Sequence, residues 1–349
     1  MSRIAAALGP NGYGTYRLEW GEEGPVFEPV SCEPEVWVIP GFIDIHFHGA
    51  YGIDLMSAST KDILSLCNQL EEEGYEGFLA TTVTAKTDQV STMIKNLPDH
   101  PMILGIHLEG PFISKLYPGA QPSGPIQDPV DAEPEWDAIF ESDLLRLMTF
   151  APELPGSSEL VQKMAAKGVL MSMGHTNATY EEAEWAHKQG ATHVTHMFNG
   201  MRRFHHREPG IVGYALSHPD LNLELIYDRY HVSPHAVKLL LQNRPVHTIF
   251  GISDSTMATG LPDGSEFIMW GQACEVQSGQ VYLKNQKVLA GSSISMLNVY
   301  QNFAEDFGDE IAVQVCCYNP RRALGIKTRP KMWLVLDQSR KIIEKHKVL

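Results

Sequence analysis

The chain has 349 residues, of which 43% are hydrophobic and 20% are charged, so it is long enough for one large globular domain or two ordinary ones. Its formal net charge of −15 argues against non-specific nucleic-acid binding, which requires clustered Lys and Arg. Five scattered cysteines without a CxxC argue against a disulfide framework, and no apolar run approaches the ~18 residues of a membrane span. We therefore expect a cytoplasmic protein that binds neither nucleic acid nor membranes.

Eight short runs of apolar and β-branched residues predict strands. The runs are Val36–Phe47, Gly77–Ala85, Met102–Leu108, Leu145–Ala151, Val169–Gly174, Thr192–Phe198, Leu223–Tyr230 and Thr248–Ser253. Segments with helical spacing and capping residues lie between several of them, namely Thr60–Gly74, Thr179–Gly190 and Ser233–Asn243. Alternating strands and helices argue for a parallel sheet, and eight strands favour a closed (β/α)₈ barrel over an open sheet.

The two ends of the chain lack helical periodicity. The N-terminal end alternates short polar and apolar stretches, and the C-terminal end contains the strand-like run MWLVLD. We expect residues 1–39 and 327–349 to form one small β domain, and residues 40–326 to form the barrel.

The segment PGFIDIHFHG ends the first predicted strand with two histidines. Side chains alternate between the faces of a strand, so His46 and His48 point the same way. They stand at the carboxyl end of the strand, where barrels carry their active sites. Two imidazoles on one face can bind a divalent ion, although a lone HxH is more often a pair of core or surface histidines.

Four more residues of metal-ligand type stand at the ends of later predicted strands. They are Glu109 in HLEGPF, His175 in MGHTN, His196 in THMFNGM and Asp254 in SDSTMATG. His107 lies two positions before Glu109 and is expected to face the same side. Core packing does not explain six such residues at strand ends, because buried polar groups are unfavourable unless they are paired or metal-bound. The sequence therefore predicts a metal centre.

The ordered motifs PGFIDIHFHG, HLEGPF, GHT, THMFNGM, REPG and SDSTMATG resemble the N-acetylglucosamine-6-phosphate deacetylase family of the amidohydrolase superfamily. The resemblance implies a metal-dependent TIM-like barrel with a small β-sandwich domain formed by both termini. It also implies hydrolysis of the acetamido group of an N-acetyl amino-sugar phosphate. The leading prediction is the conversion of N-acetylglucosamine 6-phosphate to glucosamine 6-phosphate and acetate. A homodimer is expected as well, because such enzymes are commonly dimers.

The resemblance also divides the metal ligands. Glu109, His175 and His196 are expected to hold the principal ion, and His46 and His48 a second ion where both are bound. Ligands of this chemistry fit zinc first, and also Fe, Mn, Co or Ni.

Catalytic and substrate-binding residues follow from the same resemblance. Asp254 matches the aspartate that takes a proton from water and delivers it to the departing nitrogen. Arg207 suits the phosphate because its fork of donors fits phosphate oxygens, whereas the competing interpretation is a salt bridge with Glu208. The complete set of expected substrate contacts is Gln121, Asn199, Gly200, Arg207, His231, Leu289, Ala290 and Gly291.

Several features depart from the family pattern. Gln121, in YPGAQPSG, stands where the family has a substrate-contacting His, and Gln cannot be cationic. The segment NGMRRFHH is unusually basic, and Asp228-Arg229-Tyr230 is bulky enough to narrow the pocket. These departures leave open a deacetylase of a different hexosamine, such as N-acetylgalactosamine 6-phosphate.

Two other classes of protein fit these residues less well. An amidohydrolase acting on a cyclic or N-acyl amide often uses a carboxylated lysine, but no Lys stands at the relevant strand end and Glu109 does. A non-catalytic barrel is disfavoured because Asp254, the proton-transfer group, is present.

Overall fold

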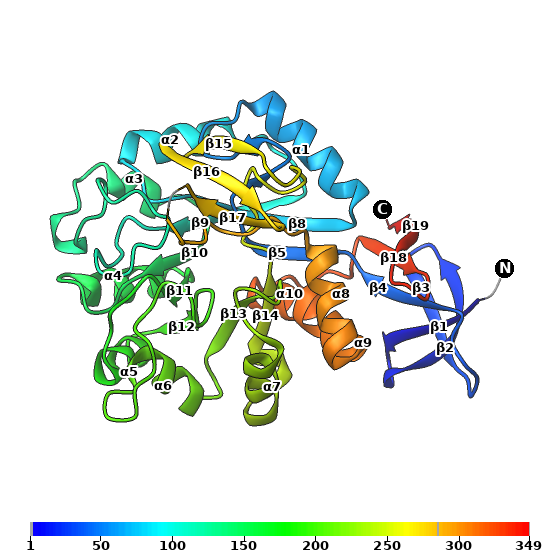
Figure 1. The fold of residues 1–349 in the computed structure, drawn as a ribbon. Coiled ribbons are helices and arrows are strands. Elements are labelled where there is room, and N and C mark those ends of the chain that lie inside the picture. Colours follow the sequence, from blue (N-terminus) through cyan, green and yellow to red (C-terminus); the bar gives the residue numbers. More distant parts are fainter. Residues whose placement is uncertain (1–2, 285, 349) are drawn as a thin grey trace.

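The computed structural model describes residues 3–284 and 286–348, and its centre is the predicted parallel barrel (Figure 1). Hydrogen-bonded neighbours follow the chain order, each parallel to the next. The strands are β5 (Phe42–Phe47), β8 (Tyr75–Thr81), β9 (Ile103–Glu109), β10 (Leu145–Phe150), β11 (Leu170–Met173), β12 (Ala191–Val194), β13 (Asn222–Ile226) and β14 (Ile249–Ile252). Each strand overlaps one of the eight predicted runs.

The first predicted run proves to be two strands that belong to different sheets. β4 (Val36–Pro40) joins the small domain, and β5 begins the barrel after Gly41. A Cβ on Gly41 would lie only 2.9 Å from the Cβ of Glu76, so the chain passes between the two sheets at a point too tight for a side chain.

The barrel closes between its first and last strands at their carboxyl ends. The amide of Asp254 donates to the carbonyl of His46 at 3.0 Å, and the amide of His48 donates to the carbonyl of Ser255 at 2.9 Å. Phe47 and Ser255 form the corresponding parallel bridge. These closing hydrogen bonds, called the barrel seam below, therefore join predicted site residues.

Helices surround the barrel, and two of them begin at the predicted caps Thr179 and Ser233, whereas the first is capped by Ser59, one residue before the predicted Thr60. Ser59 and Thr179 form capping boxes with Asp62 and Glu182, and Ser233 caps the helix that starts at Pro234. The helices are α1 (Thr60–Glu72), α2 (Thr87–Asn96), α3 (Trp136–Phe140), α4 (Ser157–Ala166), α5 (Tyr180–Lys188), α6 (Gly210–Ser217), α7 (Pro234–Asn243), α8 (Met296–Phe307), α9 (Asp309–Val313) and α10 (Asn319–Ala323). Among the described helices, none is long and apolar enough to cross a membrane.

Both termini build one sheet beside the barrel, as predicted (blue and red strands in Figure 1). Its strand order is β19-β18-β4-β1-β2-β3, with β1 parallel to β4 and the other pairs antiparallel. The remaining strands are β1 (Arg3–Gly9), β2 (Gly12–Gly21), β3 (Gly24–Pro29), β18 (Met332–Leu336) and β19 (Ile342–Lys347). Tyr16, Val38 and Trp333 are buried in its own apolar cluster.

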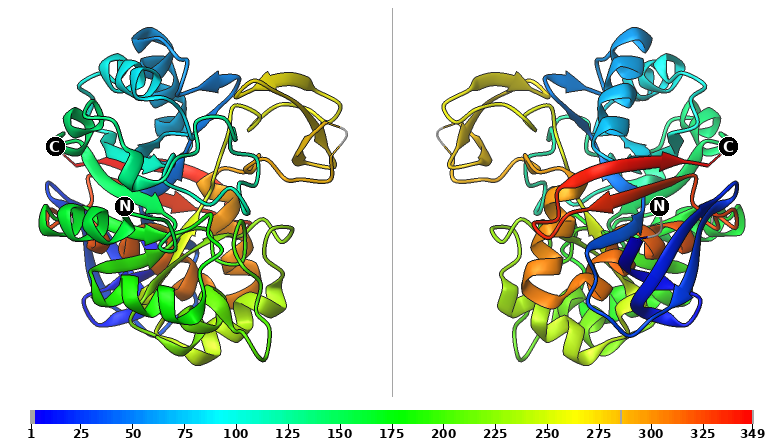
Figure 2. Two further views of the ribbon diagram at one scale, coloured as in Figure 1. Left: turned by 90° about the vertical axis from the view of Figure 1, so that its left-hand side faces the viewer. Right: turned by 90° about the vertical axis from the view of Figure 1, so that its right-hand side faces the viewer.

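A second small sheet, not predicted from the sequence, follows the last barrel strand. It consists of β15 (Glu266–Met269), β16 (Gln272–Gln277) and β17 (Gln280–Leu283), all antiparallel. Figure 2 shows it in yellow, projecting from the barrel. Gln272 Nε2 donates to the carbonyl of Ala120 at 2.7 Å, which ties this β15–β17 sheet to the loop after β9.

Candidate active site

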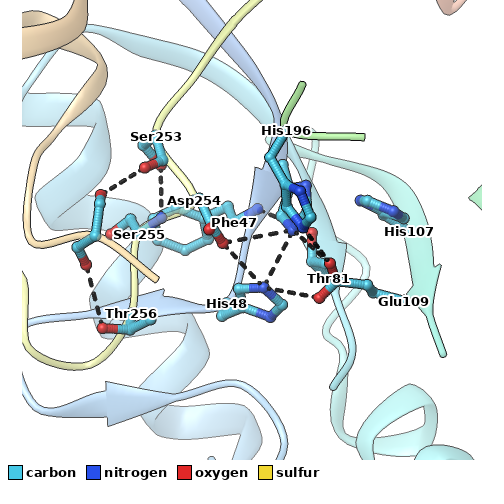
Figure 3. Close-up of polar contacts among 12 residues, drawn as sticks. Phe47, His48, Thr81, His107, Glu109, His196, Ser253, Asp254, Ser255 and Thr256 are labelled. Carbon is cyan, nitrogen blue, oxygen red and sulfur yellow. Dashed lines mark hydrogen bonds and ion pairs between the residues drawn. The ribbon is translucent and has the colours of Figure 1, made fainter. Parts of the chain in front are cut away.

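The six predicted metal-centre residues converge at the carboxyl ends of the barrel strands. Figure 3 shows four of them, His48, Glu109, His196 and Asp254. Their ligand atoms form two groups, each with all atoms within 4.8 Å of one another and every residue buried. One group is His46, His48 and Asp254, and the other is Glu109, His175 and His196.

Glu109 belongs to the second group and also reaches the first. Its Oε1 is 3.2 Å from Nε2 of both His175 and His196, and 3.4 Å from Nε2 of His46. Its Oε2 is 3.4 Å from Nε2 of His48. Because one carboxylate reaches both groups, Glu109 could serve one ion or bridge two.

Backbone conformation helps to aim three of these side chains. His175, His196 and Asp254 have φ values of 45°, 27° and 48°, in the left-handed region that non-glycine residues rarely adopt. Each stands two residues beyond the end of its strand, β11, β12 or β14. Strained backbone of this kind is typical of functional sites. Here it turns each side chain toward the other residues of the two groups, a direction that a continued strand would not give.

Hydrogen bonds fix the rings of His175 and His196. Nδ1 of His175 is 2.9 Å from the carbonyl of Tyr117, and Nδ1 of His196 is 3.1 Å from the carbonyl of Asn199. A carbonyl only accepts, so each Nδ1 carries the proton and each Nε2 presents a lone pair. The two Nε2 atoms lie 3.1 Å apart.

His46 is oriented by Glu224, a residue that was not predicted from the sequence. Glu224 on β13 is fully buried, and its Oε2 lies 3.1 Å from His46 Nδ1. His46 Nε2 consequently faces Nε2 of His48 at 3.2 Å. The available sequence signal was a Glu between the apolar residues Leu223 and Leu225, because a carboxylate in a buried strand is costly unless it is paired.

The donor set fits a divalent metal. The Nε2 lone pairs of His175 and His196, which face one another at 3.1 Å, repel unless a positive ion lies between them. Ligand atoms around a tetrahedral zinc, with bonds of about 2.0–2.1 Å, are separated by roughly 3.3 Å. The spacing of the histidine and carboxylate atoms matches that separation.

Electrostatics favour positive charge at the same place. Burial lowers the pKa of His48, but hydrogen bonds and charge from Asp254 and Glu109 outweigh it and raise the pKa to about 9. Burial raises the pKa of Glu109, yet His46, His175 and His196 hold it well below its usual value. The carboxylates thus create a potential that attracts a cation.

His107 lies outside both groups. Its Nδ1 is 3.1 Å from the carbonyl of Ile45 and its Nε2 is 2.7 Å from Oγ1 of Thr149. Its ring meets that of His46 edge-on, with centroids 4.5 Å apart. His107 therefore packs against the ring of His46 and helps to hold it in place.

A cavity of about 270 Å³ opens onto the two groups. Six of the eight predicted substrate contacts line it, namely Gln121, Asn199, Gly200, His231, Leu289 and Gly291. Gly200 has φ +59°, and a Cβ there would lie 3.0 Å from Nδ1 of His175, so glycine lets the backbone approach the ligands. Ala290 is buried in the apolar cluster of the β15–β17 sheet, off the cavity wall.

Gln121 is turned toward the ligands. Its Nε2 donates to Glu109 Oε2 at 2.5 Å, and its Oε1 accepts from the amide of Thr84 at 2.7 Å. Gln121 thus holds the carboxylate that both groups share.

The basic side chains of the loop after β12 are not on the cavity wall. Arg207 is exposed, with Nη1 2.9 Å from Nε2 of His206, and Arg202 Nε donates to the carbonyl of Asn177 at 2.8 Å. Among the described residues of the cavity wall, the one Lys or Arg is Lys287, which sequence reasoning did not single out.

The bulky segment before His231 does not narrow the pocket, contrary to expectation. Asp228 Oδ2 accepts from His231 Nδ1 at 2.7 Å, Arg229 pairs with Asp306, and Tyr230 is 63% exposed. The segment instead orients His231, whose own ring lines the cavity.

Comparisons with known proteins agree with this geometry. Residues 37–329 match the family model described as "Amidohydrolase family". N-acetylglucosamine-6-phosphate deacetylase of Bacillus subtilis (strain 168) is 37% identical over 284 residues, which are 78% of this chain and 71% of the relative.

Two solved structures are also similar. The N-acetylglucosamine-6-phosphate deacetylase of Thermotoga maritima superposes with a TM-score of 0.89 at 31% identity, covering 100% of this chain and 98% of that one. A mutant of the Mycobacterium smegmatis deacetylase, in complex with N-acetyl-D-glucosamine-6-phosphate, superposes with a TM-score of 0.86 at 26% identity, covering 99% of this chain and 98% of that one.

The barrel and its paired ligand groups, together with the match over residues 37–329, make this chain an amidohydrolase, a member of a metal-dependent family of hydrolases. Within that class it belongs to the N-acetylglucosamine-6-phosphate deacetylase family.

Proposed function

We propose that this chain hydrolyses the acetamido group of N-acetylglucosamine 6-phosphate, releasing glucosamine 6-phosphate and acetate. The observation that carries the proposal is the position of Glu109, whose two oxygens reach both ligand groups on the floor of a cavity. Membership of the deacetylase family supports the same reaction, and so does the similarity to a relative in complex with this sugar phosphate.

The metal is proposed to be zinc, held by Glu109, His175 and His196, with a second ion at His46 and His48. Imidazole and carboxylate ligands of this number suit zinc, although Fe, Mn, Co and Ni accept the same donors. When bound, a divalent ion supplies Lewis-acid polarisation of the amide carbonyl and makes a nearby water more acidic.

Asp254 is proposed to carry the proton. Its carboxylate is on the cavity wall, with Oδ1 3.3 Å from Nε2 of His48. A carboxylate at this place can accept a proton from the attacking water and then deliver it to the departing nitrogen. Its backbone is fixed by the barrel seam to His46, which limits movement of the acid–base group during turnover.

We propose that His231, and Asn199 and Gly200 in the loop after β12, contact the sugar. His231 donates from Nδ1 to Asp228, so its Nε2 remains available to accept from a sugar hydroxyl. Asn199 and Gly200 line the cavity beside the ligands.

The phosphate requires a cation, and the floor of the cavity is acidic. Lys287 is proposed as one phosphate contact, because it lies on the wall and has no ion-pair partner among the described residues. Arg207 remains our second predicted phosphate contact, although its exposed side chain is off the wall. A homodimer and a cytoplasmic location also remain predictions.

A substrate panel tests the proposal. Acetate release should be fastest with N-acetylglucosamine 6-phosphate and slower with N-acetylgalactosamine 6-phosphate and with unphosphorylated N-acetylglucosamine. If the protein prefers N-acetylgalactosamine 6-phosphate, the proposed sugar is wrong but the proposed reaction, deacetylation, still holds. Hydrolysis of cyclic amides alone would reject the proposal.

A further inference from the structure

Trp270 occupies an unusual position at the tip of a hairpin. Met269 pairs with Gln272, so Trp270 and Gly271 form the two-residue turn between β15 and β16. Their φ values are 53° and 77°, both positive, as a type I′ turn requires. Asn and Gly are the usual residues of such turns, and a bulky side chain at positive φ is an outlier that points to a role.

The indole of Trp270 is fixed against the metal-ligand groups. Its ring lies edge-to-face with that of His48, with centroids 5.3 Å apart at 67°. Its Nε1 donates to Asp54 Oδ1 at 3.4 Å, and Asp54 belongs to the short strand pair that directly follows His48. Gln272, two residues on, ties the hairpin to Ala120, so contacts on both sides of the turn hold the indole on the cavity wall.

The position of Trp270 within the cavity determines which part of the substrate it contacts. The bond to be hydrolysed must lie beside the ligand atoms, so the acyl group is the part of the substrate at the depth of His48. Trp270 contacts His48 and is the largest apolar side chain of the cavity wall. We propose that Trp270 limits the acyl group to acetyl by closing the cavity beside His48. This inference rests on the proposed deacetylase function.

The test is the dependence of kcat/KM on acyl length. Glucosamine 6-phosphate is prepared with N-acetyl, N-propionyl and N-butyryl groups. Each added methylene that does not fit costs roughly 10-fold or more in kcat/KM, so the native protein should fall about 100-fold from acetyl to butyryl. Trp270→Ala should reduce that fall to about 10-fold or less, because the removed ring leaves room for the longer chains.

Two further variants separate a specificity role from a structural one. Trp270→Phe keeps an aromatic wall and should retain most of the acetyl preference. Ile268→Ala removes an exposed apolar side chain of the same hairpin that is not on the cavity wall, and should leave the acyl profile unchanged. Equal losses of kcat/KM on all three substrates in Trp270→Ala would overturn the inference, as would a gain for butyryl in Ile268→Ala alone.

Failure of this inference is distinguishable from failure of the proposed function. If the native protein releases no acetate from N-acetylglucosamine 6-phosphate, the function is wrong and the acyl proposal falls with it. If the native protein is active and Trp270→Ala keeps the native acyl profile, only the role of Trp270 is wrong.

Discussion

The amide of Asp254 donates a hydrogen bond to the carbonyl of His46 at 3.0 Å, while Asp254 Oδ1 lies 3.5 Å from His46 Nε2. The backbone bond closes the barrel between β14 and β5, and the side chains meet in the candidate metal centre. Because the same two residues make both contacts, the position of the proposed proton carrier relative to its neighbouring ligand is set by closure of the barrel.

Asp254→Asn should separate catalysis from folding. The backbone seam is preserved, but an amide cannot take a proton from water, so kcat should fall by about 100-fold to 10,000-fold. Acetate release gives the rate, and elemental analysis should still find the ion of Glu109, His175 and His196. Asp263→Asn, on an exposed loop, serves as the control and should leave kcat unchanged. Unaltered kcat in Asp254→Asn would refute the proton role.

Glu224→Gln should weaken the binding of one of the two proposed ions more than that of the other. Loss of the carboxylate charge removes the support of His46 Nδ1, and such changes typically lower metal affinity by about 10-fold to 100-fold. Competition with a chromogenic chelator should show a larger loss for the ion of His46 and His48, since Glu224 Oε2 contacts the ring of His46 at 3.1 Å but only the backbone amide of His196, at 3.4 Å. The ion at His175 and His196 is the internal reference, and equal weakening of both would contradict the orienting role.

Lys287→Met should affect only phosphorylated substrates. We expect KM for N-acetylglucosamine 6-phosphate to rise about 10-fold at low salt with little change in kcat, since a charge-assisted contact to phosphate is lost. Turnover of unphosphorylated N-acetylglucosamine should not change. Lys284→Met is a matched control, because Lys284 is close by on the chain but pairs with Glu266 at 2.5 Å. An equal KM increase in both variants would argue against a phosphate site at Lys287.

Stability should depend on pH through His193, which lies outside the metal groups. Burial lowers the pKa of His193 from 6.5 to about 4, and Asn222 Nδ2 donates to its Nε2 at 3.2 Å. The unfolded chain therefore binds more protons than the folded one between these values, so its contribution to stability is complete above pH 6.5 and declines as the pH falls toward 4. The loss between about pH 7 and about pH 5 should be roughly 2 kcal/mol.

Urea unfolding of the native protein and of His193→Gln at both pH values measures this contribution. The variant should lose roughly 2 kcal/mol less than the native protein on acidification. His247→Gln, at an exposed histidine, should behave like the native protein. Identical pH dependence in His193→Gln would show that His193 is not kept neutral by the fold.

Much of the barrel was predictable because its signals are local. β-branched runs indicated all eight strands, and the predicted caps Thr179 and Ser233 begin helices because their side-chain oxygens accept from free backbone amides. The division at Gly41 was not predictable, because it depends on how closely the chain passes Glu76 in another part of the fold.

The residues that gather in the candidate metal centre were predictable from position, whereas the residues that contact them were not. His46 and Glu109 stand at strand ends in recognisable motifs. Glu224 and Trp270 act through contacts between segments far apart in the sequence, and Gln121 proves to contact Glu109. Sequence patterns specify faces and ends of elements, but contacts of this kind arise only when the barrel closes.

Metal reconstitution with N-acetylglucosamine 6-phosphate as substrate tests the central claim most directly. The protein is stripped with a chelator, assayed for acetate release, and assayed again after zinc is returned. We expect the activity to be lost on stripping and restored by zinc, with stoichiometric formation of glucosamine 6-phosphate. Acetate release that survives complete removal of metal, or its absence from the zinc-loaded protein, would contradict a metal-dependent deacetylase.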